Sequence, residues 1–128
     1  MADTRPIVLV IDDNADFAES VASIIESADC RAVVATDGLT GLILAQEFCP
    51  ALILCDLSMP GFGGEDVLRA LQADPSMANV PRVLMSGHGC PDLRVIPADA
   101  FIAKPINTQS LRRLVRAFTH TAKDAVVD

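Results

Sequence analysis

The sequence predicts an α/β protein in which a doubly wound sheet of five parallel strands carries helices on both faces. Five short apolar runs support this prediction, because most of them lack the polar and apolar alternation of half-exposed strands. Helical patterns separate the runs, and right-handed crossovers leave few topologies for such a (βα)5 order beyond an open, doubly wound sheet. The length of 128 residues suits one domain.

The expected strands are short and aliphatic. They are Ile7 to Ile11, Ala32 to Ala35, Ala51 to Cys55, Val83 to Met85 and, as the weakest pattern, Ala100 to Ala103. Hydrophobic residues make up 51% of the chain and aromatic residues 4%, with no Trp or Tyr, so we expect an aliphatic core. This composition excludes an intrinsically disordered chain and a collagen-like repeat.

Helices are expected where apolar residues recur at helical spacing. The patterns run from about Asn14 to Ala28, from Gly38 to Phe48, from Glu65 to Ala73, and onward from a capping residue at Asn107. Phe17 belongs to the inward face of the first pattern. The outward side of the last pattern carries Arg112, Arg113 and Arg116.

Charge and cysteine usage exclude several classes of protein. A formal net charge of -7 argues against binding to the phosphate backbone of nucleic acids. No apolar run approaches the roughly 18 residues of a membrane span, and the N-terminus lacks the pattern of a signal peptide. The four cysteines form neither a CxxC pair nor a zinc pattern, which favours free thiols in a reducing cytosol. We therefore expect a cytoplasmic protein without a direct nucleic-acid or membrane partner.

Polar residues follow four of the five expected strands. Asp12 and Asp13 follow the first strand, Asp56 the third, Ser86 the fourth and Lys104 the fifth. The carboxyl ends of parallel strands meet at one edge, so these side chains should converge. Three carboxylates at one place repel unless a cation compensates, and Mg²⁺ suits oxygen ligands of this kind. Lys104 and Ser86 add a positive charge and a donor for phosphoryl oxygens, which together predicts a phosphoryl-transfer site.

With these motifs in this order, the chain resembles the receiver domain of two-component response regulators, the CheY-like family. The resemblance covers essentially the whole chain and rests on four motifs: Val8 to Asn14, Asp56 to Gly61, Ser86-Gly87, and Phe101 to Pro105. It implies a flavodoxin-like (βα)5 receiver fold. We expect the receiver domain to span residues 1–120 and residues 121–128 to form a flexible C-terminal tail.

The resemblance also assigns roles around a Mg²⁺ cofactor. It implies that Asp56 is the nucleophile and is phosphorylated from a phosphohistidine of a sensor histidine kinase or phosphotransfer protein. Asp13 and Asp56 look like direct Mg²⁺ ligands, Asp12 like a ligand through water, and the Ser58 carbonyl like a further ligand. Lys104 would neutralise charge on the transferred group.

Three further features follow from the resemblance. Ser86 and Phe101 look like the switch pair, with Ser86 contacting the phosphoryl oxygen and Phe101 rotating. The bond between Lys104 and Pro105 is expected to be cis. The protein is then a signalling receiver that catalyses only its own phosphorylation and dephosphorylation, and its downstream protein partner stays unknown.

The chain departs from the family between Ser86 and Lys104, where the spacing is about one helical turn short. Pro91 can start a helix but Pro97 cannot continue one, which predicts a stub or irregular loop in place of the fourth helix. Receivers that dimerise through this region pair acidic residues of that helix with basic residues of the last one. Asp92 is the sole acid of the stub, so we expect a monomer.

Two alternatives to a phosphorylated receiver stay open. A phosphatase of the haloacid dehalogenase type would also use an Asp nucleophile at a strand end. That type needs a second Asp two residues later, where this chain has Ser58, and it places the nucleophile on the first strand. A receiver-like binding module that works without phosphorylation is the other alternative, although every residue of the site is present.

Overall fold

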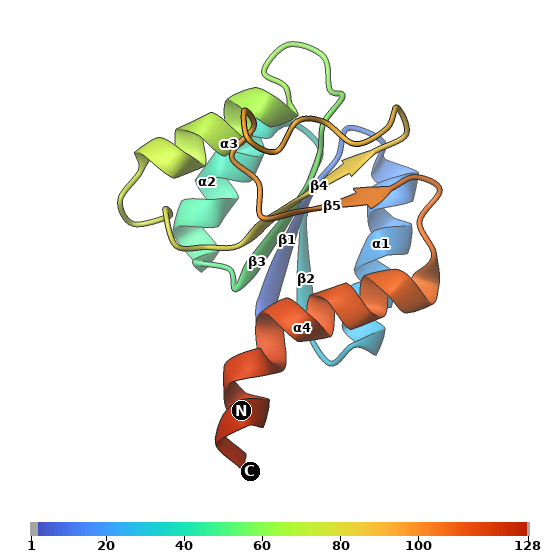
Figure 1. The fold of residues 1–128 in the computed structure, drawn as a ribbon, viewed down its shortest axis with the longest axis vertical. Helices are drawn as coiled ribbons and strands as arrows, with labels where there is room; N and C mark the ends of the chain where they lie inside the picture. The colour runs from blue at the N-terminus through green and yellow to red at the C-terminus, as the bar shows by residue number, and fades with distance from the viewer. Residues whose placement is uncertain (1–2, 128) are drawn as a thin grey trace.

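Five parallel strands form one sheet in the order β2-β1-β3-β4-β5, which confirms the predicted doubly wound fold (Figure 1). The structure is a computed structural model that describes residues 3–127, with side chains described for residues 3–120. The elements are β1 (Ile7–Ile11), α1 (Ala15–Ser27), β2 (Arg31–Ala35), α2 (Gly38–Phe48), β3 (Leu52–Asp56), α3 (Gly64–Ala73), β4 (Arg82–Ser86), β5 (Ala100–Ala103) and α4 (Thr108–Val127).

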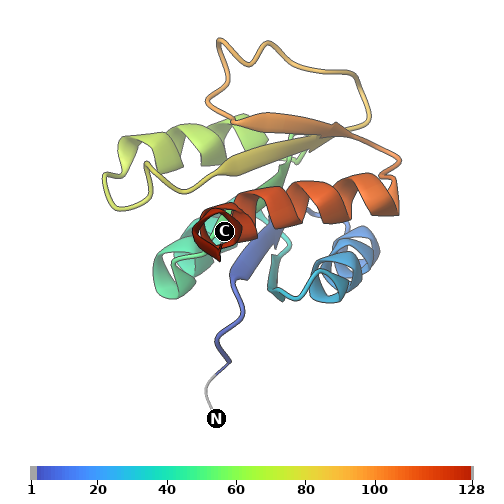
Figure 2. The same cartoon turned by 60° about the horizontal axis from the view of Figure 1, so that its bottom comes forward.

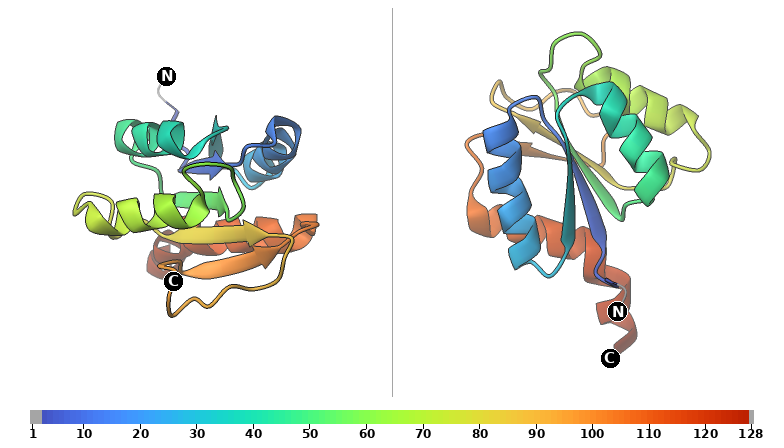
Figure 3. Two further views of the ribbon diagram at one scale, coloured as in Figure 1. Left: turned by 90° about the horizontal axis from the view of Figure 1, so that it is seen from above. Right: turned by 180° about the vertical axis from the view of Figure 1, so that it is seen from behind.

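The sheet separates two pairs of helices, as the view from above shows (Figure 3). Residues of β1 and β3 alternate between the two faces, so Val10 and Leu54 pack towards α1 and α4, whereas Leu9 and Ile53 pack towards α2 and α3. All four side chains are at most 1% exposed. Because both faces are buried, the strands read as continuous aliphatic runs rather than as alternating ones.

Strand boundaries differ by one residue or so from the apolar runs of the sequence. β3 begins and ends one residue later than predicted, and β4 includes the flanking Arg82 and Ser86. Ladder pairing continues through these polar residues, for example between Asp56 and Met85 and between Ser86 and Ala103. The polar ends of the strands are therefore buried parts of the sheet, since Asp56, Arg82 and Ser86 are each at most 5% exposed.

Side-chain caps fix where three of the helices begin. Asn14 accepts a hydrogen bond from the Phe17 N–H at 3.1 Å, and Asp37 accepts one from the Thr40 N–H at 2.8 Å. Asn107 accepts one from the Ser110 N–H at 3.0 Å, which confirms the cap expected before the last helix. Each cap satisfies an N–H group that the helix itself leaves without a partner.

The segment between β4 and β5 confirms the expected loss of the fourth helix. In this described stretch the chain forms a single turn, in which the N–H groups of Val95 and Ile96 both donate to the Asp92 carbonyl at 3.0 Å. The loop passes along the β5 edge of the sheet (Figure 2). Ile96 is 8% exposed and packs in the cluster beneath α2 and α3, and the partly buried Leu93 and Ala98 pack against the same cluster, so these side chains anchor the loop where a helix would otherwise lie.

The last helix, α4, extends past residue 120, the expected end of the receiver domain. The backbone of α4 stays helical from Thr108 to Val127. The flexibility of residues 121–128 stays a prediction, since their side chains and Asp128 lie outside the described part. Within the described residues, no helix combines the length and apolarity needed to cross a membrane.

Gly64→Ala should destabilise the fold, because Gly64 places the start of α3 directly against the end of β3. An added Cβ would overlap the Asp56 carbonyl oxygen and lie 2.7 Å from Leu57 Cα. Backbone atoms cannot move aside as a flexible side chain can, so we expect the free energy of unfolding to fall by about 2 kcal/mol in urea titrations. Gly87→Ala is the control, since its Cβ would meet Lys104 Cβ at an ordinary 3.8 Å. Equal losses in the two variants would contradict the close approach.

Candidate functional site

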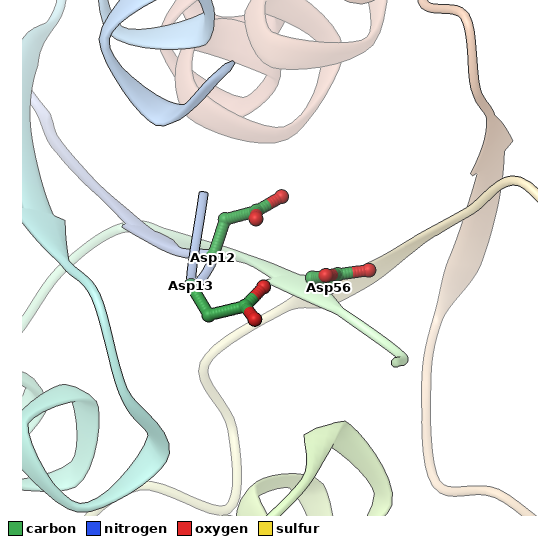
Figure 4. A group of neighbouring side chains, drawn as sticks. All are labelled: Asp12, Asp13 and Asp56. Atoms are coloured by element: carbon green, nitrogen blue, oxygen red, sulfur yellow. The ribbon is translucent and has the colours of Figure 1, made fainter. Parts of the chain in front are cut away.

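Three carboxylates converge at the carboxyl edge of the sheet. One ligand oxygen from each of Asp12, Asp13 and Asp56 lies within 4.8 Å of the other two. Asp12 and Asp13 leave the end of β1, and Asp56 ends β3 (Figure 4). Asp12 is fully buried and Asp56 is 5% exposed, whereas Asp13 is exposed. The grouping that strand ends predict is therefore present, and it opens to solvent on the Asp13 side.

Lys104 bridges the two buried carboxylates. Its Nζ donates to Asp12 Oδ2 at 3.0 Å and lies 3.3 Å from Asp56 Oδ1. The second Asp12 oxygen accepts the Asn14 N–H at 2.9 Å, and Asp56 Oδ1 also accepts the Ser58 N–H at 3.3 Å. These contacts fix the direction of both carboxylates before any ligand binds.

The charges of the cluster shift two pKa values. Burial raises the pKa of Asp56, and the neighbouring Asp12 carboxylate raises it further, against the opposing effect of Lys104. Burial alone would lower the pKa of Lys104, but the hydrogen bond to Asp12 and the charges of Asp12 and Asp56 raise it. Lys104 therefore stays an ammonium group at neutral pH, and Asp56 carries its charge at an energetic cost.

The donor set fits a hard divalent cation. When all three carboxylates are ionised, the single Lys104 ammonium leaves two negative charges without compensation. Oxygen ligands of this type suit Mg²⁺, which takes carboxylates together with waters and substrate oxygens. Ser58 adjoins the cluster through its N–H bond to Asp56. The exposed side at Asp13 gives such an ion a way in from solvent.

A backbone hydrogen bond joins Ser86 to Lys104. Ser86 is 1% exposed at the end of β4, and its carbonyl accepts the Lys104 N–H at 2.9 Å. Its hydroxyl oxygen accepts the His88 N–H at 3.1 Å. The peptide bond between Lys104 and Pro105 is cis, the geometry that the resemblance implies. Phe101 is half-buried on β5 and packs with the cluster under α2 and α3.

Sequence reasoning missed one member of the site. Phe17 was expected only as a core residue of the first helix, and it does pack against the core between α1 and the sheet. Its ring also faces the Lys104 ammonium, with Nζ 4.3 Å from the ring centroid. The one signal in the sequence is its position a single turn after the acidic pair.

The chain is a doubly wound α/β domain that gathers a lysine and three carboxylates at the carboxyl edge of its sheet, where ligands bind in folds of this class. The family model for the response regulator receiver domain matches residues 8–116. The chain therefore belongs to the receiver domain family of two-component signalling, as the motifs predicted.

Curated relatives carry the same domain. The DNA-binding response regulator MtrA of Mycobacterium tuberculosis is 34% identical over 117 residues, which cover 88% of this chain and 50% of that protein. The DNA-binding dual master transcriptional regulator RpaA of Synechocystis is 29% identical over 116 residues, covering 88% of this chain and 48% of the regulator. The chain thus spans about half the length of these relatives.

Solved structures agree on the fold. The chemotaxis protein CheY4 of Vibrio cholerae superposes with a TM-score of 0.83 at 21% identity, covering 90% of this chain and 99% of that one. The receiver domain of a putative LuxO repressor protein from Vibrio parahaemolyticus gives a TM-score of 0.79 at 26% identity, covering 97% and 98% of the two chains. The predicted CheY-like architecture is confirmed.

Asp56→Asn is expected to stabilise the protein at neutral pH, because it removes a buried charge that faces Asp12. Burial and the charge of Asp12 both raise the pKa of Asp56, so we expect a higher free energy of unfolding in the variant than in the parent without divalent cations. The raised pKa means that the folded state holds the Asp56 proton more tightly than the unfolded state. The parent therefore loses stability as pH rises from about 4 through the raised pKa, and the advantage of the variant grows over that range.

Urea unfolding at about pH 4 and about pH 7.5 measures this difference. Asp92→Asn is the matched control, since it removes the same charge from an exposed turn where hydrogen bonds from Arg94 lower the pKa of the carboxyl. The control should show no gain at either pH. A loss of stability in Asp56→Asn at neutral pH would show that the Asp56 carboxylate is well compensated in the fold.

Proposed function

We propose that this receiver accepts a phosphoryl group on Asp56 from a phosphohistidine of a sensor histidine kinase or phosphotransfer protein. The observation that carries the proposal is the bridge from Lys104 Nζ to Asp12 at 3.0 Å and Asp56 at 3.3 Å, beside a cluster of three carboxylates. It puts a nucleophile, a fixed positive charge and a set of cation ligands within one small space. Membership of the receiver family supports the same assignment.

The transfer is a displacement at phosphorus. An Asp56 carboxylate oxygen forms a bond to phosphorus while the phosphorus–nitrogen bond of the donor breaks, and its electron pair stays on the imidazole nitrogen. The product is an acyl phosphate on Asp56. Lys104 stabilises the charge on the phosphoryl oxygens, since such reactions depend mainly on positioning and electrostatics.

A bound Mg²⁺ would supply further neutralisation of the phosphoryl charge. In this proposal Asp13 and Asp56 would bind it directly, Asp12 would bind it through water, and the Ser58 carbonyl would be a further ligand. The proximity of the three carboxylates supports this set, because one oxygen from each lies within 4.8 Å of the other two at the edge of the sheet (Figure 4).

Phosphorylation would then change which partner the domain binds. The added charge of about -1.5 to -2 attracts the Ser86 hydroxyl, whose O–H can donate to a phosphoryl oxygen because its oxygen only accepts the His88 N–H, and the half-buried Phe101 follows. Ser86 is tied to Lys104 through the backbone, so a shift of either residue is felt by the other. The two arrangements form a two-state equilibrium that the phosphoryl group biases.

The alternatives have less support. A haloacid dehalogenase type of phosphatase needs a general acid two residues after the nucleophile, and that position is Ser58, an exposed residue next to Asp56. Asp56 also ends the third strand along the chain rather than the first. A binding module that works without phosphorylation would not need the bridge of Lys104 between two buried carboxylates.

Three further proposals concern the oligomeric state, nucleic-acid binding and cellular location of the protein. We keep a monomer as the expected state, because the single turn after β4 leaves Asp92 paired with Arg94 rather than offered to a second copy. The net charge of -7 keeps direct nucleic-acid binding an unfavoured output for this domain. A cytoplasmic location stays a prediction, consistent with four free cysteines among the described residues.

Incubation with acetyl phosphate and Mg²⁺ should add the mass of one phosphoryl group to the parent protein, as intact-mass spectrometry would show. Asp56→Asn should abolish the gain, since an amide cannot form the acyl phosphate. Asp66→Asn is the control on the exposed face of α3 and should be phosphorylated like the parent. A gain that persists in Asp56→Asn would move the acceptor to another residue.

A further inference from the structure

The Lys104 ammonium has three close neighbours, and one of them is neutral. Nζ lies 3.0 Å from Asp12, 3.3 Å from Asp56 and 4.3 Å from the centroid of the Phe17 ring. The side chain of Lys104 is 24% exposed, so most of its surface touches protein. A cation over an aromatic face is attracted by the negative charge of the ring surface, and the attraction strengthens as water is excluded.

The Phe17 ring and the two carboxylates should respond differently to a bound cation in their attraction for the Lys104 ammonium. Asp12 and Asp56 attract the ammonium only while their charge is free, and a divalent ion at the same oxygens competes for that charge. The attraction of Phe17 does not depend on the charge of the carboxylates. If a divalent cation neutralised Asp12 and Asp56, the Phe17 ring would be the neighbour whose attraction for the Lys104 ammonium is unchanged.

Phe17 is itself fixed by the site that it serves. Its N–H donates to the Asn14 side chain at 3.1 Å, and the Asn14 N–H donates to Asp12 Oδ1 at 2.9 Å. Asp12 in turn accepts the Lys104 ammonium, so the contacts form a closed ring from Asp12 through Asn14, Phe17 and Lys104 back to Asp12. The helix cap at Asn14 therefore connects the position of the Phe17 side chain to that of the Asp12 carboxylate.

We propose that Phe17 is a positioning residue that holds the Lys104 ammonium beside Asp56 during phosphoryl transfer. The inference rests on the proposed function, because Lys104 must reach the phosphoryl oxygens for its position to matter. An ammonium that is free to turn into solvent loses that position, whereas one held against the ring keeps it.

Phe17→Leu and Phe17→Tyr separate the aromatic face from mere packing. Leu keeps an apolar side chain in the core, and Tyr keeps the ring. With acetyl phosphate and Mg²⁺, phosphorylation of Phe17→Leu should slow roughly fivefold, equivalent to about 1 kcal/mol, whereas Phe17→Tyr should stay within about twofold of the parent. Equal slowing in both variants, or none in Phe17→Leu, would overturn the proposal.

A double-mutant cycle tests whether Phe17 acts through Lys104. In a Lys104→Ala background, Phe17→Leu should change the rate by less than about twofold, since the group it positions is gone. The full fivefold effect in that background would make Phe17 a packing residue and overturn the proposal. If the parent itself gained no phosphate, the proposed function would fall, so the two failures are distinct.

Nuclear magnetic resonance provides a readout that does not depend on phosphorylation. The methylene protons next to the Lys104 ammonium should be shifted upfield by the Phe17 ring in the parent. The shift should persist in Phe17→Tyr and when Mg²⁺ is added, and it should disappear in Phe17→Leu. Loss of the shift on adding Mg²⁺ to the parent would show that the ring does not hold Lys104 in the loaded site.

Discussion

Repulsion between three carboxylates at the carboxyl edge of the sheet is the constraint on which the rest of the site depends. Asp12, Asp13 and Asp56 place ligand oxygens within 4.8 Å of one another, and two of the three residues are buried. Such an arrangement raises the free energy of the folded state unless positive charge is supplied. Lys104 supplies part of it, at 3.0 Å and 3.3 Å from the two buried carboxylates, and the negative charge that remains is the basis of the proposed cation site.

Packing in the rest of the fold offsets the unfavourable repulsion between the carboxylates at this edge. Two aliphatic clusters, one on each face of the sheet, bury most of β1 and β3 completely. Gly64 lets α3 approach the end of β3, and the Asn14 cap ties the start of α1 to Asp12. Closely packed elements therefore position the carboxylates of the site, as the proposed phosphoryl transfer requires.

Much of this arrangement was predictable because it depends on patterns along the chain. Strand ends in a parallel sheet meet at one edge, so Asp12 and Lys104 were expected together although 92 positions separate them. Prolines at 91 and 97 predicted the missing helix. Strand boundaries were less predictable, because Asp56 and Ser86 are polar yet buried within the ladder. The contact between Phe17 and Lys104 was not predictable, since helical periodicity shows which face turns inward but not which side chain it meets there.

The most direct test of the central claim is the thermal stability of the protein as Mg²⁺ is added, with KCl at matched ionic strength as the comparison. A cation that neutralises the remaining negative charge of the three carboxylates binds the folded state in preference to the unfolded state. The midpoint temperature of thermal unfolding of the parent should therefore rise with Mg²⁺ concentration. The rise should be much smaller in Asp13→Asn, which lacks the exposed ligand. A parent that melts at the same temperature in Mg²⁺ and in matched KCl would contradict the account.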